Sequence, residues 1–363
     1  MHILVTGGSG FIGRYFVRQL REQGHRVTIL DLWEPDFDTM GARYIWGDVR
    51  DPAAVRRALP GVDRVLNLAA AHHDFGIDAD TYFSVNETGS RVLLDACDEF
   101  GIREVAFYST CAVYGAAQGP HDESAEPSPL TAYGASKLAG EKVHREWIAR
   151  GMGRRVLVIR PTVTFGADNF ANMFSLIRQI ESGKFVTVGD GSNIKSLSYV
   201  ENIVDATLFL WAKDDRAAFD VFNYTDTPDM TSQEIADTIR IALGRKPSKV
   251  RIPLGLACGL AAPFDLFIKL TGKNLPISSA RIRKLFATQT KFEGVKVREA
   301  GYVAKVPLAE GIRRMVAWYL AEGKARKAVW RIPPLAVQTR GVETVTLPAS
   351  PAKAPAPALV SAA

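Results

Sequence analysis

The chain has 363 residues, 47% of them hydrophobic, which suits one large α/β domain with a smaller attached one. Its formal net charge is +6, but residues 322–363 hold six basic and two acidic side chains, so only +2 belongs to the rest. A nearly neutral body without a stripe of aromatic and basic residues excludes nucleic-acid binding as the favoured function.

The cysteines and the first residues bear on the compartment. Cys97, Cys111 and Cys258 are widely spaced in segments that we expect to be buried, so neither a disulfide framework nor a metal site is predicted. The chain starts with strand-forming residues and not with a charged segment followed by an apolar one. We therefore expect no signal peptide and a cytoplasmic location.

The first predicted unit is a strand, a glycine-rich turn and a helix. The strand covers residues 2–5, and helical periodicity runs from Arg14 to Gln23. Glycines in such a turn let the backbone approach a pyrophosphate, while amides at the start of the helix face its phosphates. The turn predicts dinucleotide contacts at Gly7, Gly10, Phe11, Ile12 and Gly13.

The second predicted strand, Arg26 to Leu30, ends in Asp31. A carboxylate about twenty residues after the glycine turn is placed to accept hydrogen bonds from the ribose hydroxyls of NAD. A 2′-phosphate would be repelled there, so NAD is favoured over NADP as the cofactor. The alternative is that Asp31 is only a turn or cap residue.

Strands and helices continue to alternate up to residue 160. The predicted strands cover residues 44–46, 64–68, 105–108 and 156–159, and the predicted helices begin at residue 52 and cover residues 82–100 and 129–150. This order implies a doubly wound parallel sheet, Rossmann-like, with its ligand crevice at the carboxyl ends of the strands. Asp48 and Val49 could contact an adenine there, and Ala69 and Ala70 are small enough to let a cofactor lie against the strand end. Plain tight packing is the alternative for the alanines.

The helix predicted over residues 129–150 carries Tyr133 and Lys137 on one face, because four residues are about one turn. An ammonium beside a phenol favours the phenolate and lowers the pKa of the phenol, as a general base for an alcohol requires. Such a pair also arises by chance on helix surfaces. However, Tyr133 alone among the ten tyrosines has a lysine four positions later.

The pattern is less regular after residue 160. The predicted helices cover residues 172–182, 200–213, 231–243 and 308–320, and the predicted strands cover residues 185–188 and 219–223. We expect residues 161–325 to cover the crevice and contact a substrate, with some segments returning to the main sheet.

Two further segments are defined by composition. The charge-free run Ile252 to Phe264 is too short to cross a membrane, and we expect it in the core. A peripheral helix that binds a membrane surface or a partner is the alternative. Residues 333–363 are rich in proline and alanine, so we expect a disordered tail.

From Met1 to about Leu320 the chain resembles the extended short-chain dehydrogenase/reductases, in the branch of nucleotide-sugar epimerases and dehydratases. The resemblance is carried by Thr6–Gly13, Gly47–Val49, Leu68–Ala70, Val85–Gly89, Ser109–Gly115, the Tyr133 and Lys137 pair, and Tyr199–Asn202. It implies an NAD-binding domain over residues 1–160 and adds Leu68 and Asn86 to the cofactor contacts. It also implies a homodimer formed through the helices at residues 82–100 and 129–150.

The resemblance assigns catalytic roles. Tyr133 is the acid/base, Lys137 also binds the nicotinamide ribose, and Thr110 lies beside the substrate hydroxyl. A short hydroxyl at a strand end can hydrogen-bond the oxygen from which Tyr133 takes a proton.

The resemblance also points to substrate contacts. Lys195 stands where the family binds a substrate diphosphate through an arginine, although a lysine binds phosphate only as a point charge and a solvated surface lysine is the alternative. His72 and His73 stand where the family lines the substrate pocket. We expect them to be loop histidines without a catalytic role, although either could contact a sugar hydroxyl.

Departures from the family narrow the reaction. The sugar 4,6-dehydratases carry an Asp-Glu pair after the threonine, where this chain has Cys111 and Ala112, so dehydration is not expected. Val163 replaces an asparagine that contacts the nucleotide sugar in many members, which puts the details of sugar binding in doubt.

We expect an NAD-dependent nucleotide-sugar 4-epimerase that acts through a transient 4-keto sugar. The first alternative is a dehydrogenase or reductase of a nucleotide sugar or of a sterol-like 3-hydroxy substrate, since Tyr199–Ala206 also resembles the hydroxysteroid dehydrogenase branch. The second is a dinucleotide-binding regulator without catalysis. The intact set of Thr110, Tyr133 and Lys137 speaks against the regulator.

Overall fold

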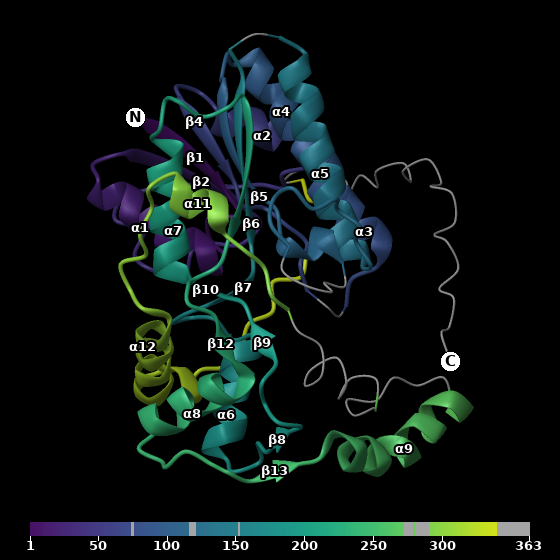
Figure 1. The fold of residues 1–363 in the computed structure, drawn as a ribbon. Coiled ribbons are helices and arrows are strands. Elements are labelled where there is room, and N and C mark those ends of the chain that lie inside the picture. Colours follow the sequence, from purple (N-terminus) through teal and green to yellow (C-terminus); the bar gives the residue numbers. More distant parts are fainter. Residues whose placement is uncertain (74–75, 116–120, 152, 272–278, 280–289, 340–363) are drawn as a thin grey trace.

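The structure is a computed structural model that describes residues 1–73, 76–115, 121–151, 153–271, 279 and 290–339. Its main sheet is parallel throughout and has the strand order β11-β6-β5-β4-β1-β2-β3 (Figure 1). The strands are β1 (His2–Thr6), β2 (Arg26–Asp31), β3 (Arg43–Trp46), β4 (Arg64–Asn67), β5 (Glu104–Tyr108), β6 (Arg155–Pro161) and β11 (Phe219–Tyr224). The doubly wound parallel sheet is therefore confirmed, and its order reverses between β1 and β4, where such folds place their ligand crevice.

Helices cover both faces of the sheet. One face carries α1 (Phe11–Glu22), α7 (Val200–Trp211) and α11 (Val295–Glu299), and the other carries α2 (Pro52–Ala58), α4 (Gly89–Glu99) and α5 (Ala132–Ala149). In β1, Ile3 and Val5 enter the first core and Leu4 enters the second, as the two-residue period of a strand requires. Burial on both faces explains the nearly continuous apolar strands.

The helix predicted over residues 82–100 has an internal change of hydrogen-bond pattern. It consists of α3 (Ala79–Phe83), a π-helical turn η1 (Ser84–Thr88) and α4. The π turn holds Asn86, whose side chain is buried toward the sheet edge. π turns of this kind occur often at functional sites.

The later part of the chain forms a smaller layer below the carboxyl edge of the sheet (Figure 1). Its helices are α6 (Asn172–Glu181), α8 (Ser232–Ala242) and α12 (Leu308–Ala321). Its short strands are β7 (Val163–Phe165), β8 (Thr187–Val188), β9 (Ile194–Lys195), β10 (Leu197–Tyr199), β12 (Met230–Thr231) and β13 (Arg251–Ile252). These strands pair two by two, β10 with β7, β12 with β9 and β13 with β8.

The apolar run at residues 252–264 is not core, and that prediction was wrong. It forms most of helix α9 (Leu254–Thr271), which extends away from α6 and α8 in Figure 1. Leu256, Leu260 and Phe264 are 57%, 63% and 41% exposed. Within this run, only the small side chains of Ala257 and Ala261 are buried. None of the helices in the described ranges is both long and apolar enough to cross a membrane.

The disorder predicted from residue 333 onward was wrong for residues 333–339. This stretch belongs to a segment at residues 326–339, which we call the C-terminal strap. The strap leaves the smaller layer near Asp168 and returns to the carboxyl edge of the main sheet, where Arg50 binds its carbonyl groups. Residues 340–363, the remainder of the predicted tail, lie outside the described residues.

Candidate active site

The glycine turn after β1 forms a tight cradle at the centre of the carboxyl edge. Gly7 has φ +68°, and a Cβ there would lie 2.7 Å from the backbone nitrogen of Ala69. Helix α1 begins at Phe11 behind Gly10, which has no side chain to cap the first amides. The hydroxyl of Ser9 is buried and has no hydrogen-bond partner among the described residues. An uncapped helix start and a buried hydroxyl suit a diphosphate, and the dinucleotide contacts of this turn stay a prediction.

Asp31 lies at the end of β2 beside this cradle. Its carboxylate accepts the backbone N–H groups of Ser9 at 3.0 Å and Trp33 at 3.1 Å. Burial raises the pKa of Asp31, and the two amides oppose that rise. A carboxylate has about four acceptor positions, so Asp31 keeps capacity for the hydroxyl groups of a ribose.

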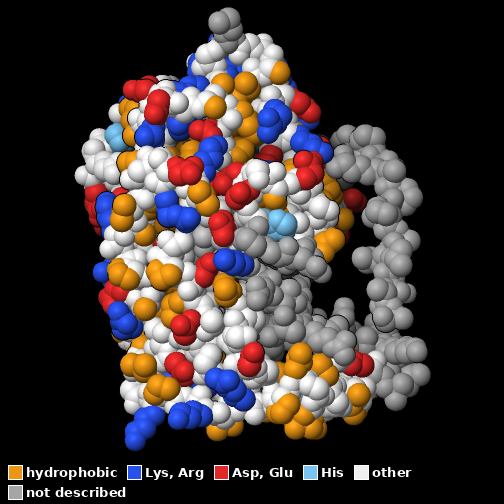
Figure 2. Space-filling view, viewed as in Figure 1, with side chains coloured by type: hydrophobic (Ala, Val, Ile, Leu, Met, Phe, Trp, Pro, Cys, Tyr) orange, Lys and Arg blue, Asp and Glu red, His pale blue; other side chains and the backbone are white. Residues whose placement is uncertain are grey.

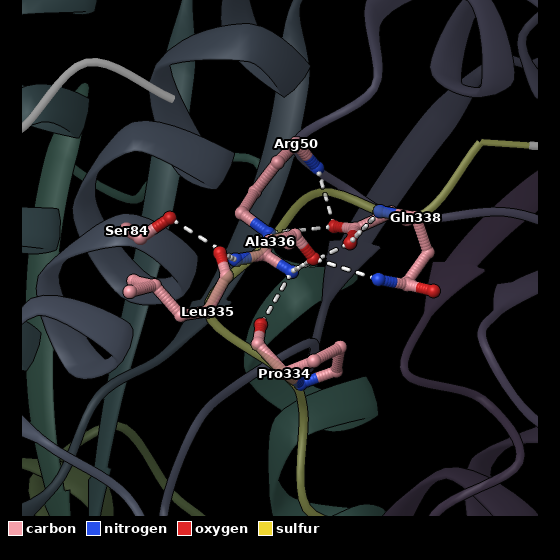
Figure 3. Close-up of polar contacts among 7 residues, drawn as sticks. Arg50, Ser84, Pro334, Leu335, Ala336 and Gln338 are labelled. Atoms are coloured by element: carbon pink, nitrogen blue, oxygen red, sulfur yellow. Dashed lines mark hydrogen bonds and ion pairs between the residues drawn. The ribbon is translucent and has the colours of Figure 1, made fainter. Parts of the chain in front are cut away.

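Asp48 and Arg50 form a buried pair that binds the C-terminal strap (Figure 3). Nε and Nη2 of Arg50 donate to the Asp48 carboxylate at 2.9 and 2.7 Å. Arg50 also donates to the carbonyl groups of the strap, at 2.9 Å for Pro334, 2.7 Å for Leu335 and 3.3 Å for Ala336. The strap therefore crosses the carboxyl edge next to the predicted cofactor crevice. No sequence pattern pointed to this contact.

The strap binds one of the two residues that we predict to contact adenine. The amide of Gln338 donates to Oδ2 of Asp48 at 3.1 Å, so the Asp48 carboxylate is already bonded to the strap. The Val49 side chain is buried in the core, so only its backbone could contact the adenine. The adenine contact of these two residues stays a prediction. Arg331 of the strap also reaches the turn, where it donates to the Ser9 carbonyl and pairs with Asp36.

The end of β4 is fixed by Asn86. The side-chain amide of Asn86 accepts the Ala71 N–H at 2.9 Å and donates to the Ala71 carbonyl at 3.0 Å and to the Ser136 hydroxyl at 2.9 Å. Leu68, Ala69 and Ala70 stay half-buried against the glycine turn. Asn86 thus ties the strand end to α5, and its predicted contact with the cofactor remains a prediction.

The first turn of α5, which carries Tyr133, packs against the turn that follows Thr110. Thr131 caps the helix by accepting the Gly134 N–H at 3.1 Å. A Cβ at Gly134 would lie 2.6 Å from the Ala112 carbonyl, so only glycine lets α5 approach the turn that follows Thr110 so closely. Thr110 is buried and its hydroxyl accepts the Ala112 N–H at 3.1 Å, which leaves the hydroxyl proton available.

Lys137 lies one helical turn after Tyr133. Tyr133 is half-buried, with its ring centroid 6.1 Å from that of Tyr82. Lys137 is 2% exposed, and its Nζ lies 4.5 Å from the centre of the Phe107 ring. Burial lowers the pKa of Lys137 to about 7, although the Glu141 carboxylate opposes this. The ammonium is therefore close to its titration point at neutral pH.

Glu141 and Arg160 form a buried ion pair that the sequence reasoning missed. Nε and Nη2 of Arg160 donate to the two carboxylate oxygens of Glu141 at 2.9 and 2.6 Å. The Ser109 hydroxyl donates to the same carboxylate, and Arg160 donates to the Tyr114 hydroxyl at 2.6 Å. The only signal was the position of Glu141, four residues after Lys137 on the same helix.

The predicted substrate contacts are more scattered. Lys195 is half-buried in β9, and burial lowers its pKa. His72 is exposed after β4, with its ring centroid 4.3 Å from that of His73. His73 is buried, and its ring lies 6.0 Å from Trp330 of the strap. The substrate contacts of Lys195 and His72 stay predictions.

The chain is similar to proteins of known activity. The model of the NAD dependent epimerase/dehydratase family matches residues 3–224. An N-acetyl-alpha-D-glucosaminyl-diphospho-ditrans,octacis-undecaprenol 4-epimerase of Escherichia coli O157:H7 is 36% identical over 326 residues, which cover 89% of this chain and 96% of that protein. A 3beta-hydroxysteroid-dehydrogenase/decarboxylase (isoform 1) of Arabidopsis thaliana is 29% identical, over 86% of this chain and 78% of that protein.

Solved structures share the fold. The UDP-glucuronic acid 4-epimerase of Bacillus cereus in complex with NAD superposes with a TM-score of 0.70 at 21% identity. The match covers 88% of this chain and 99% of that one.

The buried pair of Asp48 and Arg50 gives a first prediction. Arg50→Ala removes the cation that Asp48 and the strap carbonyls share, and leaves the carboxylate buried and unpaired. We expect a loss of about 3–5 kcal/mol in the free energy of unfolding, together with faster hydrogen exchange at residues 334–338. Denaturant unfolding and exchange mass spectrometry measure the two effects. Arg56→Ala is the matched control, because its pair with Glu99 is exposed and should contribute little. Equal effects of the two substitutions would contradict the structure.

The burial of Lys137 gives a second prediction. Its pKa is about 7 in the folded chain and near the usual 10.5 in the unfolded chain. Between these pH values the unfolded chain binds more protons, so this group makes the free energy of unfolding rise with pH. We expect the wild type to gain stability relative to Lys137→Met between pH 7 and pH 10, measured by denaturant unfolding without added cofactor. Lys142→Met, on the exposed side of α5, controls for the loss of a lysine. The burial argument would be refuted if the free energy of unfolding of the wild type, relative to that of Lys137→Met, stayed constant or fell with pH.

Proposed function

The chain belongs to the NAD-dependent epimerase/dehydratase family and is an enzyme that uses NAD, and on this premise we propose that it is a 4-epimerase of a diphosphate-linked sugar with Tyr133 as acid/base. One observation carries the proposal. Lys137 is buried one turn after Tyr133 in a helix whose start packs against the Thr110 turn. This arrangement supports the proposal, because an acid/base tyrosine needs a cation beside it and a hydroxyl donor near the substrate oxygen.

The residues divide the chemistry as follows. The charged form of Lys137 stabilises the Tyr133 phenolate, which removes the proton from the C4 hydroxyl of the sugar. The Thr110 hydroxyl donates a hydrogen bond to the same oxygen while keeping its proton, and so holds the sugar hydroxyl in line. NAD held by the glycine turn and Asp31 would supply reversible hydride transfer at C4, first from the sugar and then to the opposite face of the 4-keto sugar. Tyr133 then gives its proton back to the oxygen of the 4-keto sugar, so no net redox change results.

Dehydration does not fit these residues. Cys111 is buried and its thiol donates to the Arg160 carbonyl at 3.1 Å, and burial raises the pKa of the thiol above its usual range. Ala112 has no ionisable group. Neither residue can move a C5 proton or protonate a C6 hydroxyl, so these two positions do not support water loss from the 4-keto sugar.

For the substrate we propose a hexosamine carried on a polyprenyl diphosphate. Support comes from the E. coli relative, which acts on such a substrate and matches nearly the whole of both chains. Lys195 suits the diphosphate, because a phosphate would offset the burial that disfavours its ammonium. Val163, in place of the asparagine that contacts nucleotide sugars in the family, weakens the nucleotide-sugar alternative. The homodimer through α4 and α5 also stays a proposal.

A net dehydrogenase is the second candidate. The 29% identity to the Arabidopsis 3beta-hydroxysteroid-dehydrogenase/decarboxylase favours it. In this reaction NAD would oxidise a 3-hydroxyl group, with the same roles for Tyr133, Lys137 and Thr110. The two candidates differ in one observable, since only a dehydrogenase accumulates NADH.

The role of Tyr133 gives a third prediction. Tyr133→Phe should retain NAD and lower the turnover number by roughly 10²–10⁴-fold, because only the proton transfer is removed. Epimer ratios measured by NMR give the turnover, and the absorbance of denatured protein gives the NAD content. Tyr319→Phe is the control, because its hydroxyl bonds Glu181 at 2.6 Å in the smaller layer. Full activity of Tyr133→Phe would disprove the assignment.

The carrier gives a fourth prediction. Purified protein should interconvert N-acetylglucosaminyl- and N-acetylgalactosaminyl-diphospho-polyprenol with a higher kcat/KM than the corresponding UDP sugars. Mass spectrometry with chromatography of the released sugars measures both reactions, and absorbance at the NADH band is followed in parallel. Faster turnover of the UDP sugars would restore the nucleotide-sugar assignment. NADH formed with a 3β-hydroxysterol would establish the dehydrogenase instead.

A further inference from the structure

Helix α9 presents an apolar stripe on one face. Leu256, Leu260, Phe264 and Phe267 are 57%, 63%, 41% and 45% exposed. At about 100° per residue these four positions fall within an arc of roughly 80°. Asp265 lies opposite, where its carboxylate accepts the Ser279 N–H at 3.0 Å. The exposed apolar groups are therefore sorted onto one side of the helix.

The segment that leads into α9 is basic. From Arg245 to Phe264 the sequence has four basic side chains and no acidic one. Lys246, Lys249 and Arg251 are exposed, as is Val250 at 66%. Arg245 is held to the end of α6, where it donates to the Ile180 carbonyl at 2.7 Å. Asp190 lies close enough to offset part of the charge of Arg251.

The two features adjoin on the molecule. β13, which contains Arg251, passes directly into α9 at Leu254. Figure 2 shows hydrophobic side chains gathered over α9 at the lower right, with lysine and arginine side chains along the lower edge of the same view. An apolar stripe beside a basic segment complements the surface of a bilayer that contains anionic lipids, which offers acyl chains beneath negative headgroups.

We propose that the α9 stripe and the basic segment at residues 245–251 dock this protein on an anionic phospholipid surface. The stripe enters the boundary between headgroups and acyl chains, and Lys246, Lys249 and Arg251 lie among the phosphates. The docking helix is one short strand away from the segment that leads to Lys195, the predicted diphosphate contact, because β13 pairs with β8 and β8 is followed by Gly189 and then β9. The surface goes beyond the proposed function, since it binds without substrate and without turnover.

The experiment is sedimentation of the full-length protein with vesicles. Wild type should bind vesicles of phosphatidylcholine with phosphatidylglycerol, and bind phosphatidylcholine alone much more weakly. Leu260→Glu with Phe264→Glu should lower binding to the anionic vesicles at least tenfold. Lys246→Ala with Lys249→Ala should lower it roughly fivefold per lysine and reduce its salt dependence. Val303→Glu is the control, since Val303 is an 80% exposed residue outside α9.

Further measurements separate docking from misfolding and from catalysis. Thermal unfolding and NAD content are measured for every variant, and Leu260→Ala with Phe264→Ala provides a milder change if the glutamate pair unfolds. Tyr133→Phe should bind vesicles as the wild type does, so a failure of the proposed catalysis leaves this result intact. Stripe variants that bind like the wild type would overturn the proposal. So would a stripe variant that turns a vesicle-free dimer into a monomer, because the stripe would then be an interface between copies.

Discussion

The carboxylate of Glu141 holds together the three elements that make the candidate active site. It accepts the fork of Arg160 from the end of β6 and the Ser109 hydroxyl from the end of β5, while α5 carries it. One turn earlier on the same helix is Lys137, whose ammonium Glu141 favours against the effect of burial. Buried charges of this kind are costly unless they are paired and hydrogen-bonded. The pairing therefore holds α5, which carries Tyr133, against the ends of β5 and β6, and its carboxylate favours the charged form of Lys137.

The main sheet could be predicted because each of its strands has its own pattern in a short stretch of sequence. Parallel strands buried on both faces appear as short apolar runs, and helices with one apolar face separate them. The glycine turn and Asp31 were predictable for a related reason, since a fixed spacing links them to one ligand. Tyr133 and Lys137 needed the family resemblance in addition, because their spacing alone is common on helices.

The features that escaped prediction depend on pairing between distant parts of the chain. Arg160 meets Glu141 across nineteen positions, and Arg50 meets Leu335 across 285. The proline-rich composition before residue 340 indicated disorder. Composition alone could not show that the buried Arg50 guanidinium binds the carbonyl groups of this segment. For α9 the apolar composition was clear, but burial depends on whether another element covers the helix. The apolar side chains of a helix that binds another molecule contact that molecule, whereas those of the other elements pack in the core of the chain.

The way Arg50 binds the strap has a consequence for how this segment can change. Arg50 donates its hydrogen bonds to the backbone carbonyl groups of residues 334–336, and every amino acid carries that group. Substitutions there leave the acceptors in place, whereas the deletion of one residue would shift all of them out of register with the guanidinium. Residues 334–336 of the strap are thus free in composition and restricted in length. Variation in this stretch should accumulate as substitutions, with insertions and deletions confined to either side of it.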